Sequence, residues 1–243
     1  LKSSVSGAWV AERVWEPSLV KSLADTGIKY TILDDVHFMA AGLKENDLKG
    51  FYTTEDQGKV LNVFPISQKL RYLIPFQDVS VCMDYFRQLA NEDKDIVVVM
   101  ADDGEKFGMW PGTNKHVYEN GWLDKFLTAI EENSDIVETA TFCEVLDTIK
   151  PSGRIYLPTN SYFEMSEWTL PSTVQNSFDN FIKQNEHNSE VKPFIRGGFW
   201  RNFLNKYDES KNFDKKMIRL SNKIFNKKVS YDSEIKKALF AGQ

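Results

Sequence analysis

The sequence predicts an α/β fold, either an α/β barrel or an open α/β sheet, over residues 1–171, followed by a mainly helical region over residues 172–243. Two observations predict this. In the first region, apolar runs of strand length alternate with longer amphipathic runs, as they do where strands and helices take turns along a chain. In the second region, apolar residues recur at helical spacing among many Lys, Asn and Glu residues. We therefore expect a sheet in the first unit and helices in the second.

Four segments of the first region are expected to be strands. They are residues 7–11, 29–34, 96–100 and 155–157. The third of these, IVVVM, is almost purely apolar, and strands of continuous apolar character are typical of parallel sheets that helices cover on both faces. The sequence therefore predicts a buried parallel sheet.

The helices are predicted from their end signals and their periodicity. Pro17 suits the first turn of a helix, and Gly27 suits its end. Thr141 followed by Glu144 has the capping-box form, which opens another helix. The Gly197-Gly198 pair is expected to form a turn inside the helical region. Further helices are expected over residues 79–90 and 122–130.

Charge is unevenly distributed along the chain. The net charge is −5, yet residues 201–243 contain eleven Lys and Arg against five Asp and Glu. These basic residues flank an apolar series at helical spacing, from Phe213 to Ile224, as on the solvated face of an ordinary amphipathic helix. No basic motif with interleaved aromatics accompanies them. We therefore expect no nucleic-acid partner.

The two cysteines and the hydropathy bear on the compartment. Cys82 and Cys143 lie in apolar-rich stretches, so we expect two buried free thiols in a reducing compartment. No window approaches the roughly 20 apolar residues of a membrane span, and the start of the chain has no export signal. We expect a cytoplasmic protein with no membrane partner.

Three of the expected strands or their flanks run into carboxylates. Glu12 follows the first, Asp34-Asp35 ends the second, and Asp102-Asp103 follows the third. Because the carboxyl ends of parallel strands share one rim, these side chains are expected to converge where α/β folds build active sites. Several carboxylates on one rim point to acid/base chemistry or to metal binding.

The neighbours of these carboxylates favour sugar chemistry. His37 is the only histidine near the rim, so a metal ion has little support and we expect neither metal nor cofactor. Aromatic residues are frequent instead: Trp9, Trp15, Phe38, Phe107 and Trp110. Flat apolar faces beside carboxylates suit sugar rings, and paired carboxylates are what a glycosidase needs. The competing interpretation is that these aromatics belong to the core.

Longer motifs resemble those of a known family. The segments WVAERVWEP (9–17) and DDGEKFGMWPG (102–112) are similar to the segments that carry the nucleophile and the general acid in glycoside hydrolase family 57. The likeness is closest to its 4-α-glucanotransferases, which are amylomaltase-like and of the α-amylase type. It continues in order through residues 32–43, 64–76, 160–171 and 196–207.

The resemblance implies a fold and a set of residue roles. It implies part of an incomplete seven-stranded (β/α) barrel followed by a helical region. Glu12 would be the nucleophile, and Asp103, directly before the glycine of its motif, would be the general acid/base. Substrate-binding roles would fall on Trp9, Arg13, Asp35, His37, Glu105 and Trp110. Of these, Arg13 would also keep Glu12 ionised, and Asp35 and His37 would position other groups more than they touch sugar.

Members of that family begin upstream of these motifs and continue beyond them. We therefore expect an internal fragment that lacks part of the sugar site on its own. The expected activity is retaining transfer of segments of an α-1,4-glucan or maltooligosaccharide through a glucosyl-enzyme intermediate. A hydrolytic α-amylase is the alternative, as is an inactive or carbohydrate-binding relic, and a homodimer of the full-length protein stays open.

Overall fold

The computed structural model describes residues 5–92, 96–188, 190–191, 194–227 and 233–242. It divides into two compact units, Leu1–Tyr162 and Phe163–Gln243. The first is α/β and the second is helical, which confirms the predicted fold class. The division precedes residue 171 because Phe163–Trp168, which the sequence placed with the first unit, forms the first helix of the second.

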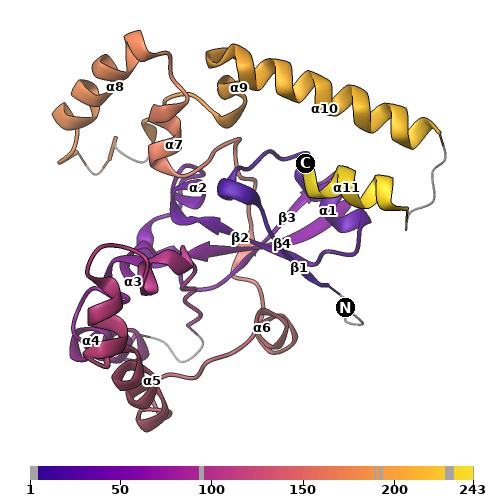
Figure 1. Ribbon diagram of the computed structural model, residues 1–243. Helices are drawn as coiled ribbons and strands as arrows, with labels where there is room; N and C mark the ends of the chain where they lie inside the picture. The colour runs from indigo at the N-terminus through magenta and orange to yellow at the C-terminus, as the bar shows by residue number, and fades with distance from the viewer. Residues whose placement is uncertain (1–4, 93–95, 189, 192–193, 228–232, 243) are drawn as a thin grey trace. The chain divides into compact units, whose positions relative to one another are not determined.

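The first unit is built on a five-stranded sheet with the order β1-β2-β4-β3-β5 (Figure 1). The strands are β1 (Gly7–Trp9), β2 (Tyr30–Asp34), β3 (Tyr52–Asp56), β4 (Lys59–Ile66) and β5 (Gly153–Arg154). Strands β1, β2 and β4 are parallel, and their register pairs Gly7 with Tyr30 and Asp34 with Ile66. This part of the sheet agrees with the sequence.

The prediction of a wholly parallel sheet was wrong, because β3 runs antiparallel to β4. The two strands form a hairpin whose loop is Gln57-Gly58, with φ of 51° and 75°. Positive φ at both central residues is what a two-residue type I′ turn requires, and glycine adopts it without strain. The dipeptide between two β-rich runs was the sequence signal for this hairpin.

Two predicted strands are shifted or reduced. Residues 96–100 make a single parallel bridge, Val99 to Ile66, because β3 already pairs with β4 as far as Val63. The strand predicted at 155–157 lies two residues earlier, at Gly153–Arg154, where it pairs with β3. Ile155 continues this pairing with only one hydrogen bond, to the Thr53 carbonyl at 2.9 Å.

The helices of the first unit follow their sequence signals. They are α1 (Leu19–Asp25), α2 (Asp35–Met39), α3 (Gln68–Leu73), α4 (Val79–Ala90), α5 (Trp122–Glu132) and α6 (Phe142–Thr148), with short 3-10 or π turns at Ala11–Arg13, Glu45–Asp47, Gly104–Phe107 and Lys115–Glu119. Thr141 caps α6 through the predicted capping box with Glu144. Gly27, just past α1, has φ of 88°.

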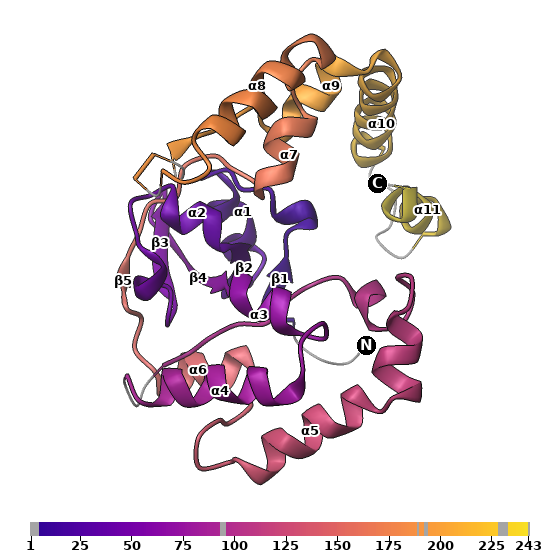
Figure 2. The same cartoon turned by 90° about the vertical axis from the view of Figure 1, so that its left-hand side faces the viewer.

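Helices cover both faces of the sheet. Alternate residues of β2 and β4 point to opposite faces, so Leu33 and Leu61 pack with α1, whereas Phe64 packs with α6. Figure 2 shows α1 and α6 on the two sides of the sheet. A third apolar cluster joins α3, α4 and α5. This double cover holds the carboxyl ends of the strands at one rim.

The second unit contains α7 (Phe163–Trp168), α8 (Ser172–Gln184), α9 (Phe203–Lys206), α10 (Asp208–Asn226) and α11 (Glu234–Gly242), with a 3-10 turn at Trp200–Asn202. Its Gly197-Gly198 pair lies against α7, where a Cβ on Gly197 would come within 2.3 Å of the Ser166 carbonyl oxygen. Only glycine allows this approach. The predicted turn is thus also a close contact between segments.

The structure bears on the two cysteines and on membrane-spanning helices. Cys82 is buried, but Cys143 is exposed on α6, so the expectation of two buried thiols was wrong. The apolar neighbours of Cys143 face the sheet while its own side chain faces outward. Among the described residues, no helix is long and apolar enough to span a membrane.

Candidate active site

The sheet topology gathers the candidate carboxylates at one rim. Glu12 follows β1, and Asp34 ends β2. Asp103 follows the segment 96–100, in which Val99 forms a parallel bridge to Ile66 of β4. The Ser67 amide also donates a hydrogen bond to the Val99 carbonyl at 2.8 Å. The strands before Glu12 and Asp34 are neighbours, β1 and β2, and β4 lies between β2 and the segment before Asp103. The rim expected from the sequence is therefore present.

Glu12 lies in a strained backbone conformation. Its φ is 53° and that of Arg13 is 49°, and neither residue is glycine. The left-handed region is costly for such residues, and strain of this kind persists where the surrounding structure requires it, often at functional sites. The Tyr162 hydroxyl donates a hydrogen bond of 2.5 Å to Glu12 Oε2. The Glu12 carboxylate is therefore held at the exposed edge of β1.

Arg13, which was expected to help keep Glu12 ionised, forms an ion pair with Asp34. Its Nη1 donates to Asp34 Oδ2 at 3.1 Å, and both side chains are buried. The guanidinium also lies 4.4 Å from the centre of the Tyr162 ring, a cation–π arrangement. Arg13 thus reaches Glu12 through the Tyr162 ring.

Asp35 and His37 are buried behind the rim on α2. Burial raises the pKa of Asp35 to about 8, and the negative charge of Asp34 and a hydrogen bond shared with it add to the effect. Burial also lowers the pKa of His37, against the opposing effect of Asp34, whose carbonyl lies 3.0 Å from His37 Nδ1. His37 has no exposed surface, so it contacts protein groups here.

The segment before Asp103 is fixed by buried charges. Asp102 forms ion pairs with Lys106 and with Arg71, whose Nε lies 3.1 Å from Asp102 Oδ2 without hydrogen-bond geometry. Burial by itself raises the pKa of Asp102, but the hydrogen bonds from Lys106 and Arg71 outweigh it and leave that pKa below its usual value. The other oxygen of Asp102 accepts from the Asp103 amide at 2.9 Å.

This arrangement gives the two adjacent aspartates different surroundings. The side chain of Asp102 is paired and buried, whereas Asp103 is exposed at the start of the Gly104–Phe107 turn. Glu105 is exposed in the same turn, and its carbonyl accepts from the amides of Met109 and Trp110 at 2.8 and 3.1 Å. Asp103 and Glu105 are the carboxyl side chains of this segment that face outward.

Aromatic side chains at the rim fall into two groups. Trp9 and Trp110 are 49% and 42% exposed, so each offers a ring face to solvent. Trp110 stacks on Phe76 with ring centres 6.0 Å apart and planes at 13°. The prediction that Trp15 lines the rim was wrong, because Trp15 is buried in the core, and so is Phe38, which is close to the rim in sequence. Both side chains pack in the apolar cluster that covers one face of the sheet.

Four residues support the candidate catalytic segments, and only Asp34 among them was named from the sequence. Tyr162, Arg71, Lys106 and Asp34 make the contacts that hold the two candidate catalytic segments. Tyr162 and Arg71 lie in motifs that resemble the family, but nothing in those motifs marks them as contacts. Asp34 had a positional signal as a strand-end carboxylate. Lys106 also lies in such a motif, at 102–112, but its burial had no sequence signal, because a lysine is normally a surface residue.

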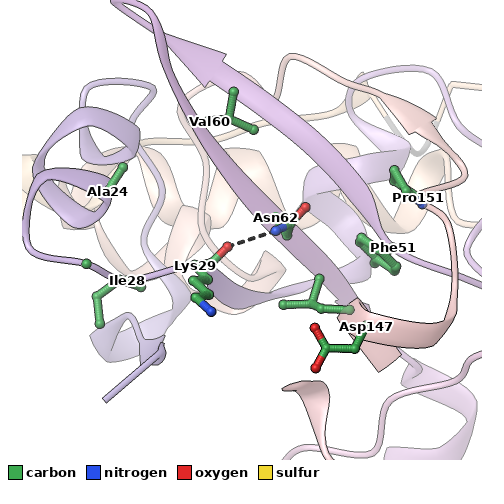
Figure 3. A pocket seen from close by; sticks show the side chains of 10 residues that line it. Ala24, Ile28, Lys29, Phe51, Val60, Asn62, Asp147 and Pro151 are labelled. Carbon is green, nitrogen blue, oxygen red and sulfur yellow. Dashed lines mark hydrogen bonds between the residues drawn. The ribbon is translucent and has the colours of Figure 1, made fainter. Parts of the chain in front are cut away.

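A hollow and possible metal sites were the other candidates for a functional site. A hollow of about 500 Å³ opens at the opposite ends of β2 and β4, between Lys29, Asn62 and Asp147 (Figure 3). It lies away from the rim, and Asn62 is hydrogen-bonded there to the Lys29 carbonyl at 3.0 Å. Among the described residues, no three His, Cys, Asp or Glu side chains form a group that could hold a metal ion.

Comparison with known proteins identifies the family. The model of glycosyl hydrolase family 57 matches residues 1–158, more than half of the chain. The chain belongs to glycosyl hydrolase family 57. Residues 198–243 also match the middle domain shared by α-amylases and 4-α-glucanotransferases. The five-stranded sheet is thus part of the (β/α)₇ barrel of family 57, followed by its helical region.

Relatives named as α-amylases and relatives named as 4-α-glucanotransferases are both similar to this chain. It is 48% identical to α-amylase 1 of Dictyoglomus thermophilum over 90% of its length, and 48% identical to the 4-α-glucanotransferase of Thermococcus litoralis over 88%. The solved structure of the latter matches 97% of the chain with a TM-score of 0.90 at 44% identity, and 36% of that structure is covered. The chain spans about a third of the length of these relatives, 32% and 33%.

Proposed function

We propose that this chain carries the catalytic carboxylates of a retaining α-1,4-glucan enzyme, with Glu12 as nucleophile and Asp103 as acid/base. The observation that carries the proposal is the contrast between Asp102 and Asp103. Asp102 is committed to Arg71 and Lys106, while Asp103 faces outward on the same rim as Glu12. Family membership supports glucan as the substrate, since the relatives are named as glucan-active enzymes.

The mechanism follows from these positions. Glu12 attacks the anomeric carbon, while Asp103 donates its proton to the departing glycosidic oxygen. The resulting ester is a glucosyl-enzyme. Asp103 then removes a proton from the incoming hydroxyl group, which attacks the anomeric carbon from the side that the first leaving group occupied and breaks the ester bond, so that Glu12 leaves as a carboxylate. The hydrogen bond from Tyr162 holds one oxygen of Glu12 and leaves the other for attack.

We further propose that the incoming group is the 4-hydroxyl of another glucan, which makes the enzyme a 4-α-glucanotransferase. The stacked pair of Phe76 and Trp110 supports this, because the two residues are 41% and 42% exposed and Trp110 follows Asp103 closely along the chain. A flat aromatic face favours a sugar ring over water as the acceptor. Hydrolysis, as in the relatives named α-amylase, is the second candidate, since their identity to this chain is equal.

The test follows maltotriose with the protein at its natural full length. A transferase converts maltotriose into glucose and chains longer than maltotriose. A hydrolase yields glucose and maltose with no longer chains. An absence of any product from a folded protein would support the relic interpretation and overturn the proposed function.

A further inference from the structure

We propose that Arg71 is a positioning residue of this active site. Its guanidinium group bridges Asp34, which lies behind Glu12, and Asp102, which lies beside Asp103. In this way it fixes the distance between the nucleophile and the acid/base. The proposal rests on the proposed function, because it assumes the roles given above to Glu12 and Asp103. Arg71 lies in the last turn of α3, which follows β4 at the rim.

One arm of the bridge reaches the acid. Arg71 Nε lies 3.1 Å from Asp102 Oδ2, and its Nη2 donates to Asp102 Oδ1 at 3.4 Å. The same Oδ1 accepts the hydrogen bond from the Asp103 amide. A single carboxyl group therefore lies between the Arg71 guanidinium and the backbone of the acid.

The other arm reaches the nucleophile through more contacts. Arg71 Nη1 lies 3.2 Å from Asp34 Oδ2, the oxygen that also pairs with Arg13. Arg13 then contacts the Tyr162 ring, and the Tyr162 hydroxyl contacts Glu12. This arm has four steps, so we expect it to transmit a displacement of Arg71 less directly than the arm to Asp103.

The helix that carries Arg71, α3, is anchored at both ends. Ser67 caps α3 by accepting from the Leu70 amide, and its own amide is bonded to Val99 of the segment that leads to the acid. At the other end, Lys106 donates to the Arg71 carbonyl at 2.6 Å. The side chain is 24% exposed, so it is packed into the rim.

The identity of the residue matters for this bridge. A planar guanidinium can direct several donors at two carboxylates at once, whereas a lysine ammonium is a point charge on a flexible stem. Retaining chemistry depends on the separation of the two carboxyl groups, and a displacement of about 1 Å can lower the rate about 100-fold. Loss of Arg71 should therefore impair proton donation by Asp103 most of all.

The experiment compares two donors in the protein at its natural full length. Maltotriose needs a proton on its leaving oxygen, but 4-nitrophenyl α-maltotrioside releases a phenolate that leaves without one. We expect Arg71→Met to lower kcat/KM on maltotriose about 100-fold and on the nitrophenyl donor less than about tenfold. Arg71→Lys should show the same order of donors with smaller losses. Arg87→Met is the matched control, because the Arg87 side chain on α4 makes exposed contacts, with Asp84 on the same helix and with Asn133 at the end of α5.

The outcomes separate this proposal from the function on which it rests. Equal losses on both donors, or no loss in folded Arg71→Met, would overturn the positioning role. If Arg71→Met does not fold by circular dichroism, Arg71→Lys decides by the same donor comparison. Glu12→Gln is measured in parallel. Turnover by Glu12→Gln at the wild-type rate would instead overturn the proposed function, whatever Arg71 shows.

Discussion

The Tyr162 hydroxyl donates to Glu12 Oε2 across 150 positions of sequence at a distance of 2.5 Å. This contact joins the end of the first unit to the turn that follows its first strand. The ring that carries the hydroxyl also supports Arg13. Tyr162 therefore restrains both left-handed residues of the nucleophile segment.

Removal of that hydroxyl should reduce catalysis while the fold persists. A hydrogen bond to a charged group contributes about 1.5–3 kcal/mol, so we expect Tyr162→Phe to lower kcat/KM roughly 10- to 100-fold. The ring stays, and with it the contact to Arg13. Steady-state kinetics on maltotriose in the full-length protein provide the measurement. Tyr156→Phe is the control, since Tyr156 is 60% exposed, and equal effects of the two variants would remove the role given to Tyr162.

The roles of the two carboxylates lead to different expected losses. Glu12→Gln removes the nucleophile and should lower kcat by about 10⁴-fold or more. Asp103→Asn removes the acid/base and should lower it about 10²- to 10⁴-fold. Asp102→Asn should still leave an amide oxygen that can accept from the Asp103 amide. A larger loss in Asp102→Asn than in Asp103→Asn would show that the acid had been assigned to the wrong neighbour.

Retention of configuration gives a geometric expectation. In the substrate complex, the carboxyl groups of Glu12 and Asp103 should lie about 5–5.5 Å apart, as in retaining enzymes generally. The sugar transferred from the glucosyl-enzyme should then be joined to its acceptor by an α linkage, which proton NMR of the product detects. A separation of about 6.5–9.5 Å together with a β product would mean inversion.

The sequence predicted the parts of this fold that depend on local chemistry. The capping box at Thr141 and the helix at Val79–Ala90 were found as expected, because each signal lies within a few residues. The hairpin of β3 and β4 was missed, although Gln57-Gly58 was a local signal for it. Val99 was expected in a full strand, but the hairpin occupies most of the partner edge. Such competition between segments is not local.

The candidate site divides in the same way. Glu12 and Asp103 could be proposed from motifs and strand ends. The contacts that hold them could not be proposed in this way, because they join residues that are far apart in the sequence. Arg71 lies 31 positions from Asp102, and Lys106 lies 35 positions from Arg71, to whose carbonyl it donates. A buried lysine has no local pattern that distinguishes it from an exposed one. Partner choice among buried charges is decided by packing.

The buried acid Asp35 should make stability depend on pH. Its pKa is raised by burial to about 8 in the folded protein, whereas an exposed aspartate titrates near pH 4. Between these values the unfolded chain loses its proton while the folded protein keeps it. The folded state therefore binds more protons, and its stability falls as pH rises from about 4 to about 8, by on the order of a few kcal/mol.

Thermal unfolding of the full-length protein across this pH range is the measurement. The midpoint should fall toward pH 8 in the wild type, and this fall should be smaller in Asp35→Asn, which stays neutral at every pH. Asp84→Asn serves as the control, because the Asp84 side chain is 73% exposed and its loss should leave the pH dependence unchanged. If Asp35→Asn keeps the full wild-type dependence, then Asp35 is ionised in the folded protein. The charge balance around Asp34 would in that case need a different partner.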